Sequence, residues 1–174
     1  MGLLDIHTLN TAAEKLRRIN PSIILYGEGW TGGKSPLPER LRAMKKNAVK
    51  LPQYAMFSDD FRDGVKGSVF EDEECGYVNG NASELSEMMK SVISGGIYRM
   101  DVQRKRSECW TDTPQQTVNY VEAHDNLTLF DKLRISMPEA SGQERVSVDK
   151  LAAGLVVFLG GISFHAGRAG DTAQ

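Results

Sequence analysis

Two carboxylate-bearing motifs stand where apolar runs of the chain end. Glu28 lies in the segment YGEGW at 26–30, directly after the apolar residues 23–25, and Asp125 follows the run at 118–122. Two carboxyl groups that flank a glycosidic bond carry out glycoside hydrolysis: one donates a proton, and the other stays ionised and stabilises positive charge on the sugar. If the two motifs meet in one pocket, the chain has the machinery of a glycosidase.

The neighbours of these carboxylates suit a sugar ligand. The indole of Trp30 offers a flat face for a sugar ring, and the side chains of His124 and Asn126 can hydrogen-bond sugar hydroxyls. Glycines on both sides of Glu28 would let a substrate approach the backbone closely. Taken one at a time, both motifs also fit a structural role, with Glu28 as a surface glutamate at a strand end and Asp125 in a turn with an Asx cap.

The elements that position these motifs alternate between helix and strand. Expected helices cover residues 5–19, 81–94 and 147–159, with a short helical patch at 39–46. Expected strands cover residues 22–26, 54–58, 118–122 and 162–164. The helix at 81–94 begins with a capping-box pattern formed by Asn81 and Glu84. The first strand is a nearly continuous apolar run, which is typical of a strand buried on both faces.

This order predicts an α/β fold of βα units around a parallel sheet. A long loop at 31–53 follows the first strand, and long loops in compact domains tend to be functional. Because parallel strands all end on one side of a sheet, we expect Glu28 and Asp125 at the same edge.

Composition and charge argue against several other functions. The net charge of −2 and the pI of about 5.9 give no electrostatic footprint for nucleic acid, so the short basic cluster at 104–106 is expected to be a solvated loop. Cys75 and Cys109 lack the spacing of a zinc site or a disulfide framework. The first residues do not resemble a secretion or lipidation signal, and the longest apolar run, 155–159, is too short to span a bilayer. We therefore expect no membrane partner and a cytoplasmic location.

Four segments together resemble the α-amylase superfamily of glycoside hydrolases (family 13), and within it the type I pullulanases, which cleave α-1,6 branches in pullulan, amylopectin and glycogen. They occur in the family's order: GLLDI at 2–6, YGEGW at 26–30, FRDGVKGSVF at 61–70 and HDNLTLFDKL at 124–133. The resemblance implies a partial TIM-type (β/α)8 barrel. Residues 1–174 would form strands five to eight with their helices, the C-terminal half of the catalytic barrel.

The resemblance also implies a role for each candidate residue. In a retaining mechanism, Glu28 would be the general acid/base and Asp125 the transition-state stabiliser. His124 and Asn126 would bind substrate hydroxyls, and Trp30 would stack on a glucosyl unit. No cofactor is expected, although many members of the superfamily carry calcium.

One expected residue has no counterpart. In the family, the nucleophilic aspartate ends the fourth strand just before the equivalent of Met1, and no residue of this sequence matches it. We therefore expect the isolated chain to be inactive. Arg62 and Asp63 lie in a family-like segment, but we expect them only to form ion pairs that stabilise a loop. The open edges and apolar interior of a half-barrel predict self-association with a second copy.

Two alternatives stay open. The chain could derive from another enzyme of the superfamily, such as an isoamylase, a branching enzyme or an α-amylase, although the sequence LTLFDKL after Asn126 favours the pullulanases. It could also be a non-catalytic oligosaccharide-binding fragment that keeps Trp30, His124 and Asn126 as a sugar platform.

Overall fold

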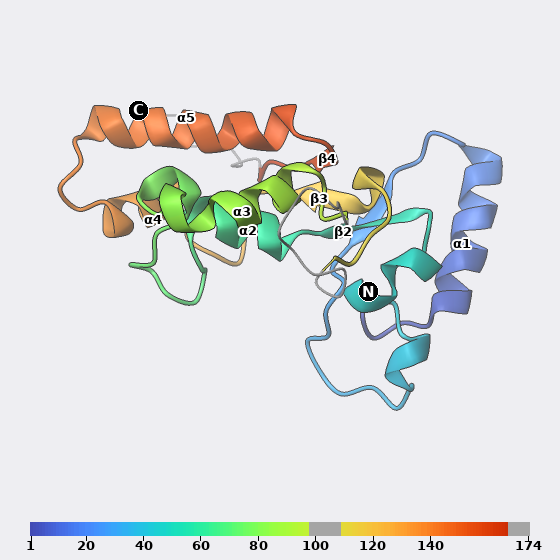
Figure 1. The fold of residues 1–174 in the computed structure, drawn as a ribbon. Coiled ribbons are helices and arrows are strands. Elements are labelled where there is room, and N and C mark those ends of the chain that lie inside the picture. Colours follow the sequence, from blue (N-terminus) through green and yellow to red (C-terminus); the bar gives the residue numbers. More distant parts are fainter. Residues whose placement is uncertain (98–108, 167–174) are drawn as a thin grey trace, which may run out of the picture.

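A parallel sheet of four strands organises the fold (Figure 1). The computed structural model describes residues 1–97 and 109–166, so the basic cluster at 104–106 lies outside the described residues. The strands are β1 (Leu25–Gly27), β2 (Tyr54–Phe57), β3 (Thr117–Asn119) and β4 (Ile162–Ser163). They lie side by side in sequence order, and every neighbouring pair is parallel. The predicted α/β architecture is therefore confirmed.

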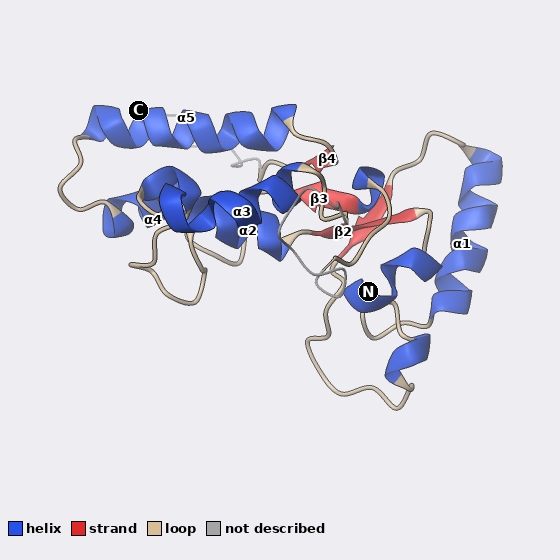
Figure 2. Cartoon of the chain, viewed as in Figure 1, coloured by secondary structure: helices blue, strands red, loops and turns tan. Residues whose placement is uncertain are grey.

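Helices connect the strands and lie in two groups. The α-helices are α1 (Ile6–Ile19), α2 (Asp59–Lys66), α3 (Ala82–Ile93), α4 (Leu129–Ser136) and α5 (Gly142–Phe158). Short 3-10 turns are η1 (Glu39–Leu41), η2 (Lys45–Lys50), η3 (Tyr77–Asn79) and η5 (Pro114–Gln116). Figure 1 shows α2 to α5 together at one end of the molecule and α1 at the other, and Figure 2 shows the strands between the two groups.

The sheet is curved, and aromatic rings fill its concave face. Tyr26 of β1 and Phe57 of β2 share this face with Tyr120 and Phe164, which follow β3 and β4. The ring centres of Tyr26 and Phe164 are 6.4 Å apart. In a flat sheet the first and fourth strands would be about 14 Å apart, so the strands must bend around these rings. The curvature agrees with a half-barrel that forms part of a TIM barrel, and its numbering as strands five to eight stays a prediction.

The opposite face of the sheet packs against α1 and the loop after β1. Leu25, Tyr54 and Met56, which alternate with the concave-face residues, join this core, and the Tyr54 hydroxyl donates to the carbonyl of Leu9 at 3.1 Å. A second core lies among α2, α3, α4 and α5. Its buried residues are Phe61, Val65, Met89, Val92, Val121, Leu129, Leu133, Ala152 and Val156.

The expectation that the first strand is buried on both faces is wrong. Ile24 and Tyr26 are 60% and 48% exposed, whereas Leu25 packs into the core. The strand also begins later than expected, because the amide of Ile23 still donates to the carbonyl of Asn20 at 3.2 Å in the turn after α1. The apolar run thus covers one face and leaves the other partly open in the described part of the chain.

Two helices, α2 and α4, were not predicted. Both begin with a hydroxyl cap: Ser58 accepts a hydrogen bond from the amide of Phe61, and Thr128 accepts one from that of Asp131. Each helix is only eight residues long, and α2 is mostly polar, so the apolar residues are too few to establish a helical period over the window that prediction needs. Packing against neighbouring helices therefore stabilises α2 and α4, although the local sequence pattern does not specify them.

The predicted capping box at Asn81 is wrong, although the helix that it was expected to begin is present as α3. Asn81 has φ −111° and ψ 34°, outside the extended region of a typical N-cap, and its side chain caps no amide. A capping box occurs instead at α5, where Ser141 and Glu144 bond each other's backbone amides at 3.2 and 2.7 Å. That cap explains why α5 begins at Gly142 rather than at 147.

Candidate active site

Glu28 stands one residue beyond β1, as the sequence predicts. Its neighbour Gly27 is the last residue of the strand and is paired in register with Met56 of β2, which fixes the backbone there. The Glu28 side chain is exposed, and in residues 1–97 and 109–166 it makes no hydrogen bond or ion pair. Glu28 is therefore an available carboxylate on a fixed backbone.

Gly29 is packed tightly against the protein itself. A Cβ atom at this position would lie 2.6 Å from the Met56 sulfur and 3.0 Å from the backbone nitrogen of Lys45. The backbone N–H of Lys45 donates to the carbonyl oxygen of Gly29 at 2.7 Å. Internal packing therefore accounts for this glycine, without the close substrate approach that the sequence suggested.

Trp30 belongs to a backbone unit that includes the start of the chain. A Cβ atom at Gly2 would lie 2.3 Å from the carbonyl oxygen of Trp30, so the two segments are in direct contact. Asp5 and Arg42 form an antiparallel β-bridge, which joins the start of the chain to the loop after β1. The side chain of Trp30 is half-buried in this unit.

Lys45 connects the loop after β1 to the start of α2. Its ammonium group pairs with Asp59 and, at 3.4 Å, with Asp60, and it lies 5.0 Å from the ring centre of Trp110. Both aspartates are in the first turn of α2, where the helix dipole favours negative charge. Sequence reasoning missed this network, although the Asp59-Asp60 pair directly after a strand was a visible signal.

Asp125 lies in the turn that follows β3. The amide of Asn126 approaches the carbonyl of Ala123 at 3.4 Å, and the side chains of His124 and Asp125 are exposed while that of Asn126 is half-buried. Within the described ranges, Asp125 makes no hydrogen bond or ion pair. The Asx cap that the sequence allowed is therefore not formed by Asp125.

Tyr120 and Glu122 anchor the two sides of this turn. The Tyr120 hydroxyl accepts a hydrogen bond from Nη1 of Arg62 at 2.9 Å, and burial raises the pKa of that hydroxyl. The Glu122 carboxylate accepts from the amide of Leu129, at the start of α4, at 2.8 Å. Arg62 in turn donates two hydrogen bonds to the carboxylate of Asp63, at 2.6 and 2.9 Å. This ion pair was expected, but it lies in helix α2 rather than in a loop.

Two buried lysines lie beneath the turn. Lys66 and Lys132 are 1% and 2% exposed, and with Asn126 they line a small cavity of about 10 Å³. Desolvation, together with the nearby charge of Arg62, lowers the pKa of Lys66 to about 8. Lys132 donates to the carbonyl oxygens of Ser68 at 3.0 Å and Glu71 at 2.6 Å. The burial of these lysines was not predicted, because it depends on contacts between distant segments.

Glu28 and Asp125 leave the sheet at the same edge. β1 and β3 are parallel and are separated only by β2, so their axes are about 10 Å apart at the usual strand spacing. Glu28 follows β1 by one residue and Asp125 follows β3 by six, so both carboxylates come after the same ends of parallel strands. Their convergence on one sugar, with Trp30, His124 and Asn126, stays a prediction.

Neither metal ligation nor membrane insertion is indicated in the part of the chain that the structure describes. There, no three His, Cys, Asp or Glu side chains come together as a set of metal ligands. The same residues contain no helix with the length and apolar character needed to cross a bilayer.

Known pullulanases resemble this chain over nearly its whole length, while no family model matches it. The pullulanase of Bacillus subtilis strain 168 is 33% identical over 169 residues, which are 97% of this chain and 23% of that protein. The structure of pullulanase from Paenibacillus barengoltzii in complex with maltohexaose and α-cyclodextrin is 40% identical, with a TM-score of 0.85 over 94% of this chain and 24% of that one. Pullulanase type I from Bacillus subtilis str. 168, complexed with maltose, is 33% identical, with a TM-score of 0.86 over 95% of this chain and 22% of that one.

The sequence comparison and the structure comparison identify the same relatives. At 33% identity, the similarity to the pullulanase of B. subtilis extends beyond a shared fold. The chain spans less than a quarter of the length of these relatives. It is related to the pullulanases, a family of glycoside hydrolases, and corresponds to one segment of their longer chains.

Proposed function

We propose that this chain supplies the acid/base and the charge-stabilising carboxylate of a retaining hydrolase that cleaves α-1,6 bonds in branched α-glucans. One observation carries the proposal: in a chain related to pullulanases, Glu28 and Asp125 follow parallel strands that end at the same edge of the sheet. Pullulan, amylopectin and glycogen are the proposed substrates.

The chemistry uses the two carboxyl groups in different states. Glu28 donates a proton to the glycosidic oxygen while a nucleophilic carboxylate attacks the anomeric carbon, and it then takes a proton from the water that hydrolyses the glycosyl-enzyme. Asp125 remains ionised and stabilises the oxocarbenium-like transition state. We assign the nucleophile to no residue of this chain, and propose that the additional length of the relatives supplies it.

The remaining candidate residues hold the substrate. Trp30 stacks on a glucosyl ring, while His124 and Asn126 hydrogen-bond its hydroxyls. A polar turn beside an exposed carboxylate suits a neutral, hydroxyl-rich ligand. Support comes from the pullulanase of P. barengoltzii, which has been solved with maltohexaose.

A chimera tests the proposal. The matched segment of B. subtilis pullulanase is replaced by this chain, and hydrolysis of pullulan is measured by reducing-sugar release. We expect the chimera to be active and Glu28→Gln to lower kcat by about 10³-fold, since a neutral amide cannot transfer the proton. Asp125→Asn should also lower kcat with little change in folding, because the side chain makes no bond within the described ranges.

The matched control is Glu14→Gln, which removes another exposed carboxylate, from α1. This variant should retain the activity of the chimera. If Glu28→Gln is as active as Glu14→Gln in a folded chimera, the proposed acid/base is wrong. Cleavage of linear amylose without cleavage of pullulan would instead favour a relationship to enzymes that cleave α-1,4 bonds, such as the α-amylases.

A non-catalytic oligosaccharide-binding function is the second candidate. It is favoured by the half-buried, partly accessible Trp30 next to the start of the chain, because such an indole can bind a sugar ring without any nucleophile. Titration of the chain with maltohexaose, followed by indole fluorescence, tests it. A Trp110→Phe background isolates the signal of Trp30, and no change at millimolar sugar would argue against binding.

We also propose that the isolated chain self-associates through the concave face of its half-barrel. Ile24 and Tyr26 leave apolar surface exposed there, and β1 and β4 are the outer strands of the sheet. Sedimentation velocity should therefore show oligomers, weakened by Ile24→Lys. The control Ile19→Lys alters a residue of α1 that is 84% exposed and should have no effect. A monodisperse monomer with a sharp thermal transition would contradict this proposal.

A further inference from the structure

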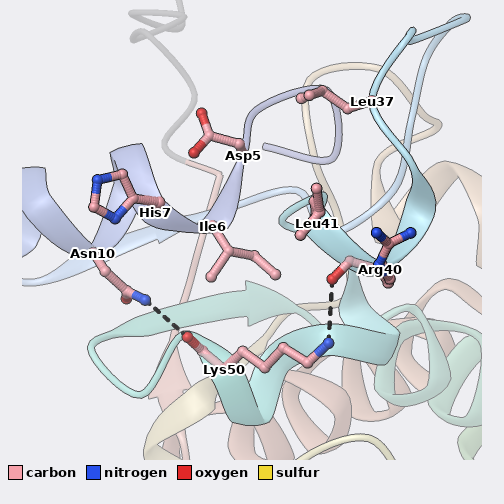
Figure 3. A pocket seen from close by; sticks show the side chains of 8 residues that line it. All are labelled: Asp5, Ile6, His7, Asn10, Leu37, Arg40, Leu41 and Lys50. Carbon is pink, nitrogen blue, oxygen red and sulfur yellow. Dashed lines mark hydrogen bonds between the residues drawn. The ribbon is translucent and has the colours of Figure 1, made fainter.

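A pocket beside α1 belongs to the framework of the fold (Figure 3). It has a volume of about 560 Å³ and lies between the first turns of α1 and the loop after β1. Figure 3 shows two hydrogen bonds at its wall: the Asn10 side-chain amide donates to the carbonyl oxygen of Lys50 at 3.0 Å, and the Lys50 ammonium donates to that of Arg40 at 3.2 Å. These bonds use the Lys50 ammonium to join distant segments. A different cavity contains a buried cation that the fold does not use in this way.

This smaller cavity lies beneath the turn that carries Asp125, where four segments meet. They are the end of α2, the loop after it, the turn after β3 and helix α4. The lining residues are Lys66, Val69, Asp72, Asn126, Leu127 and Lys132. The centre of a water-sized particle can occupy about 10 Å³ of the space, so the cavity has room for one water molecule or one small ion.

The two lysines of this cavity differ in their partners. Lys132 is 2% exposed, and its ammonium donates to the carbonyl oxygens of Ser68 at 3.0 Å and Glu71 at 2.6 Å. Lys66 is 1% exposed, and in residues 1–97 and 109–166 its ammonium forms no hydrogen bond and no ion pair. Burial of a charged group without a partner is costly. The Lys66 ammonium therefore needs an acceptor that the described residues do not supply.

Two carboxylates near Lys66 have other partners. Asp63 accepts two hydrogen bonds from Arg62, and Glu122 accepts one from a backbone amide at the start of α4. Both carboxylates raise the pKa of Lys66 through space, but neither forms an ion pair with it. Arg62 and Lys132 lower the same pKa, because they bring further positive charge.

The cavity wall itself carries more positive than negative charge. Its ionisable residues are Lys66, Lys132 and Asp72. Asp72 is exposed, and its charge raises the pKa of Lys132. This carboxylate thus offsets the lysine that already has two carbonyl partners, and Lys66 keeps an uncompensated positive charge beside the cavity.

We infer that this cavity binds a single chloride-sized monovalent anion, with the Lys66 ammonium as its principal ligand. A water molecule would supply an acceptor, but it would leave the charge uncompensated. Sulfate and phosphate are polyatomic and exceed the space. Val69 and Leu127 contribute apolar walls, which favour a weakly hydrated ion, such as chloride rather than fluoride.

A bound anion would join the turn to the helices on either side of it. Asn126 directly follows Asp125, and it shares the cavity wall with Lys66 of α2 and Lys132 of α4. An ion between these segments would reduce the freedom of the turn and so help to fix Asp125. Only this consequence rests on the proposed hydrolysis, and the inference about binding does not.

Chloride binding to the full chain tests the inference, with the ³⁵Cl line width as the readout. Potassium chloride is titrated at pH 7 in potassium sulfate, which keeps the ionic strength nearly constant and limits general charge effects. We expect excess line width that saturates, and Lys66→Met should weaken the affinity by at least about tenfold, because it removes the positive charge at the cavity. Exposed Lys15→Met is the control and should leave the affinity within about twofold. Circular dichroism checks that each variant is folded.

A second pair of variants leaves Lys66 in place. Asp72→Asn removes the carboxylate from the cavity wall and should tighten chloride binding several-fold, since a like charge no longer repels the anion. Glu73→Gln removes a neighbouring exposed carboxylate from outside the lining and should leave the affinity within about twofold. Both side chains are exposed and form no hydrogen bond or ion pair within the described ranges, so neither change endangers folding.

The pH dependence of chloride binding gives a further readout. Lys66 has a pKa of about 8, and bound chloride should raise that pKa, because the anion favours the ammonium form. Chloride affinity should therefore fall between pH 7 and pH 10, as Lys66 loses its proton. Asp72→Asn should retain this fall, since it leaves the ammonium group in place.

Three results would overturn the inference. One is the absence of saturable chloride binding to the folded chain, which would mean that water satisfies Lys66. Another is equal affinity of folded Lys66→Met and Lys15→Met. The last is equal affinity of Asp72→Asn and Glu73→Gln, which would place the ion outside this cavity.

Discussion

The backbone amide of Lys45 donates to the carbonyl oxygen of Gly29 at 2.7 Å, next to the candidate acid Glu28. This bond closes the long loop after β1 back onto the strand end. It holds the backbone around Glu28 from outside the sheet, while the pairing of Gly27 with Met56 holds it from within. A general acid needs such support, because its carboxyl group must meet a leaving oxygen within hydrogen-bond reach.

Replacing Gly29 by alanine should disrupt this support. The added Cβ would lie 2.6 Å from the Met56 sulfur and 3.0 Å from the Lys45 backbone nitrogen, which cannot both move freely. We expect a loss of roughly 1–3 kcal/mol in the free energy of unfolding, measured by urea denaturation at one protein concentration. Gly32→Ala is the control, since nothing lies within 4 Å of its Cβ position. Equal stability of the two variants would show that the Gly29 contact is unimportant.

Removing the Lys45 ammonium should loosen the same loop from the other side. Lys45→Met keeps the backbone bond to Gly29 but loses the ion pairs to Asp59 and Asp60 at the start of α2. In the chimera we expect kcat to fall several-fold while KM changes little, because the change affects the position of Glu28 and leaves sugar contacts intact. Lys46→Met, at the next position, removes a 53% exposed lysine that pairs, among the described residues, with exposed Glu39, and it should have no effect on kcat. Equal kcat in both variants would argue against positioning by Lys45.

The sequence was informative about the strands, whose apolar runs are local patterns. Apolar runs at 23–25 and 118–122 indicate the first and third strands because their residues are hydrophobic regardless of what covers them, and the ends of these runs located Glu28 and Asp125. Helix α2 escaped prediction because Asp59, Asp60, Arg62 and Asp63 make it read as a polar loop.

What could not be predicted depends on contacts between distant segments. Lys132 bonds the carbonyl of Ser68, 64 positions away, and Asn10 bonds that of Lys50, 40 positions away. A lysine is expected at the surface unless its partners are known, so neither burial beneath the Asp125 turn nor the pocket at α1 can be inferred from residue types alone.

The Tyr120–Arg62 bond offers a test of the anchor beside the Asp125 turn. Tyr120→Phe keeps the ring in the aromatic cluster but leaves a buried guanidinium N–H without its acceptor. We expect a loss of about 1–2 kcal/mol in the free energy of unfolding. Tyr26→Phe is a matched control in the same cluster, because the Tyr26 hydroxyl makes no hydrogen bond in the described ranges and its side chain is 48% exposed. A Tyr120→Phe variant as stable as Tyr26→Phe would show that the Tyr120–Arg62 hydrogen bond does not stabilise the fold.

The lowered pKa of Lys66 should make the stability of the folded chain depend on pH. The pKa of Lys66 falls from 10.5 to about 8 in the folded chain, mainly because of desolvation; Arg62 and Lys132 contribute to the decrease, and Asp63 and Glu122 oppose it. Between pH 8 and 10 the unfolded chain therefore binds more protons at this residue than the folded chain does, so stability should rise with pH. Above pH 10 the effect should reverse, because burial raises the pKa of Tyr54 and Tyr120.

The expected gain between pH 8 and 10 is at most about 2 kcal/mol, measured as the free energy of unfolding in urea at fixed salt. Lys66→Met should be as stable as the unmodified chain or more stable at pH 7, since a buried charge is replaced by an apolar side chain of similar length, and it should lose most of the rise. Lys132, whose pKa is also lowered by desolvation, accounts for what remains of the slope. Exposed Lys15→Met is the control and should keep the full rise. A pH profile of Lys66→Met that coincides with that of Lys15→Met would show that the Lys66 ammonium is solvated in the folded chain.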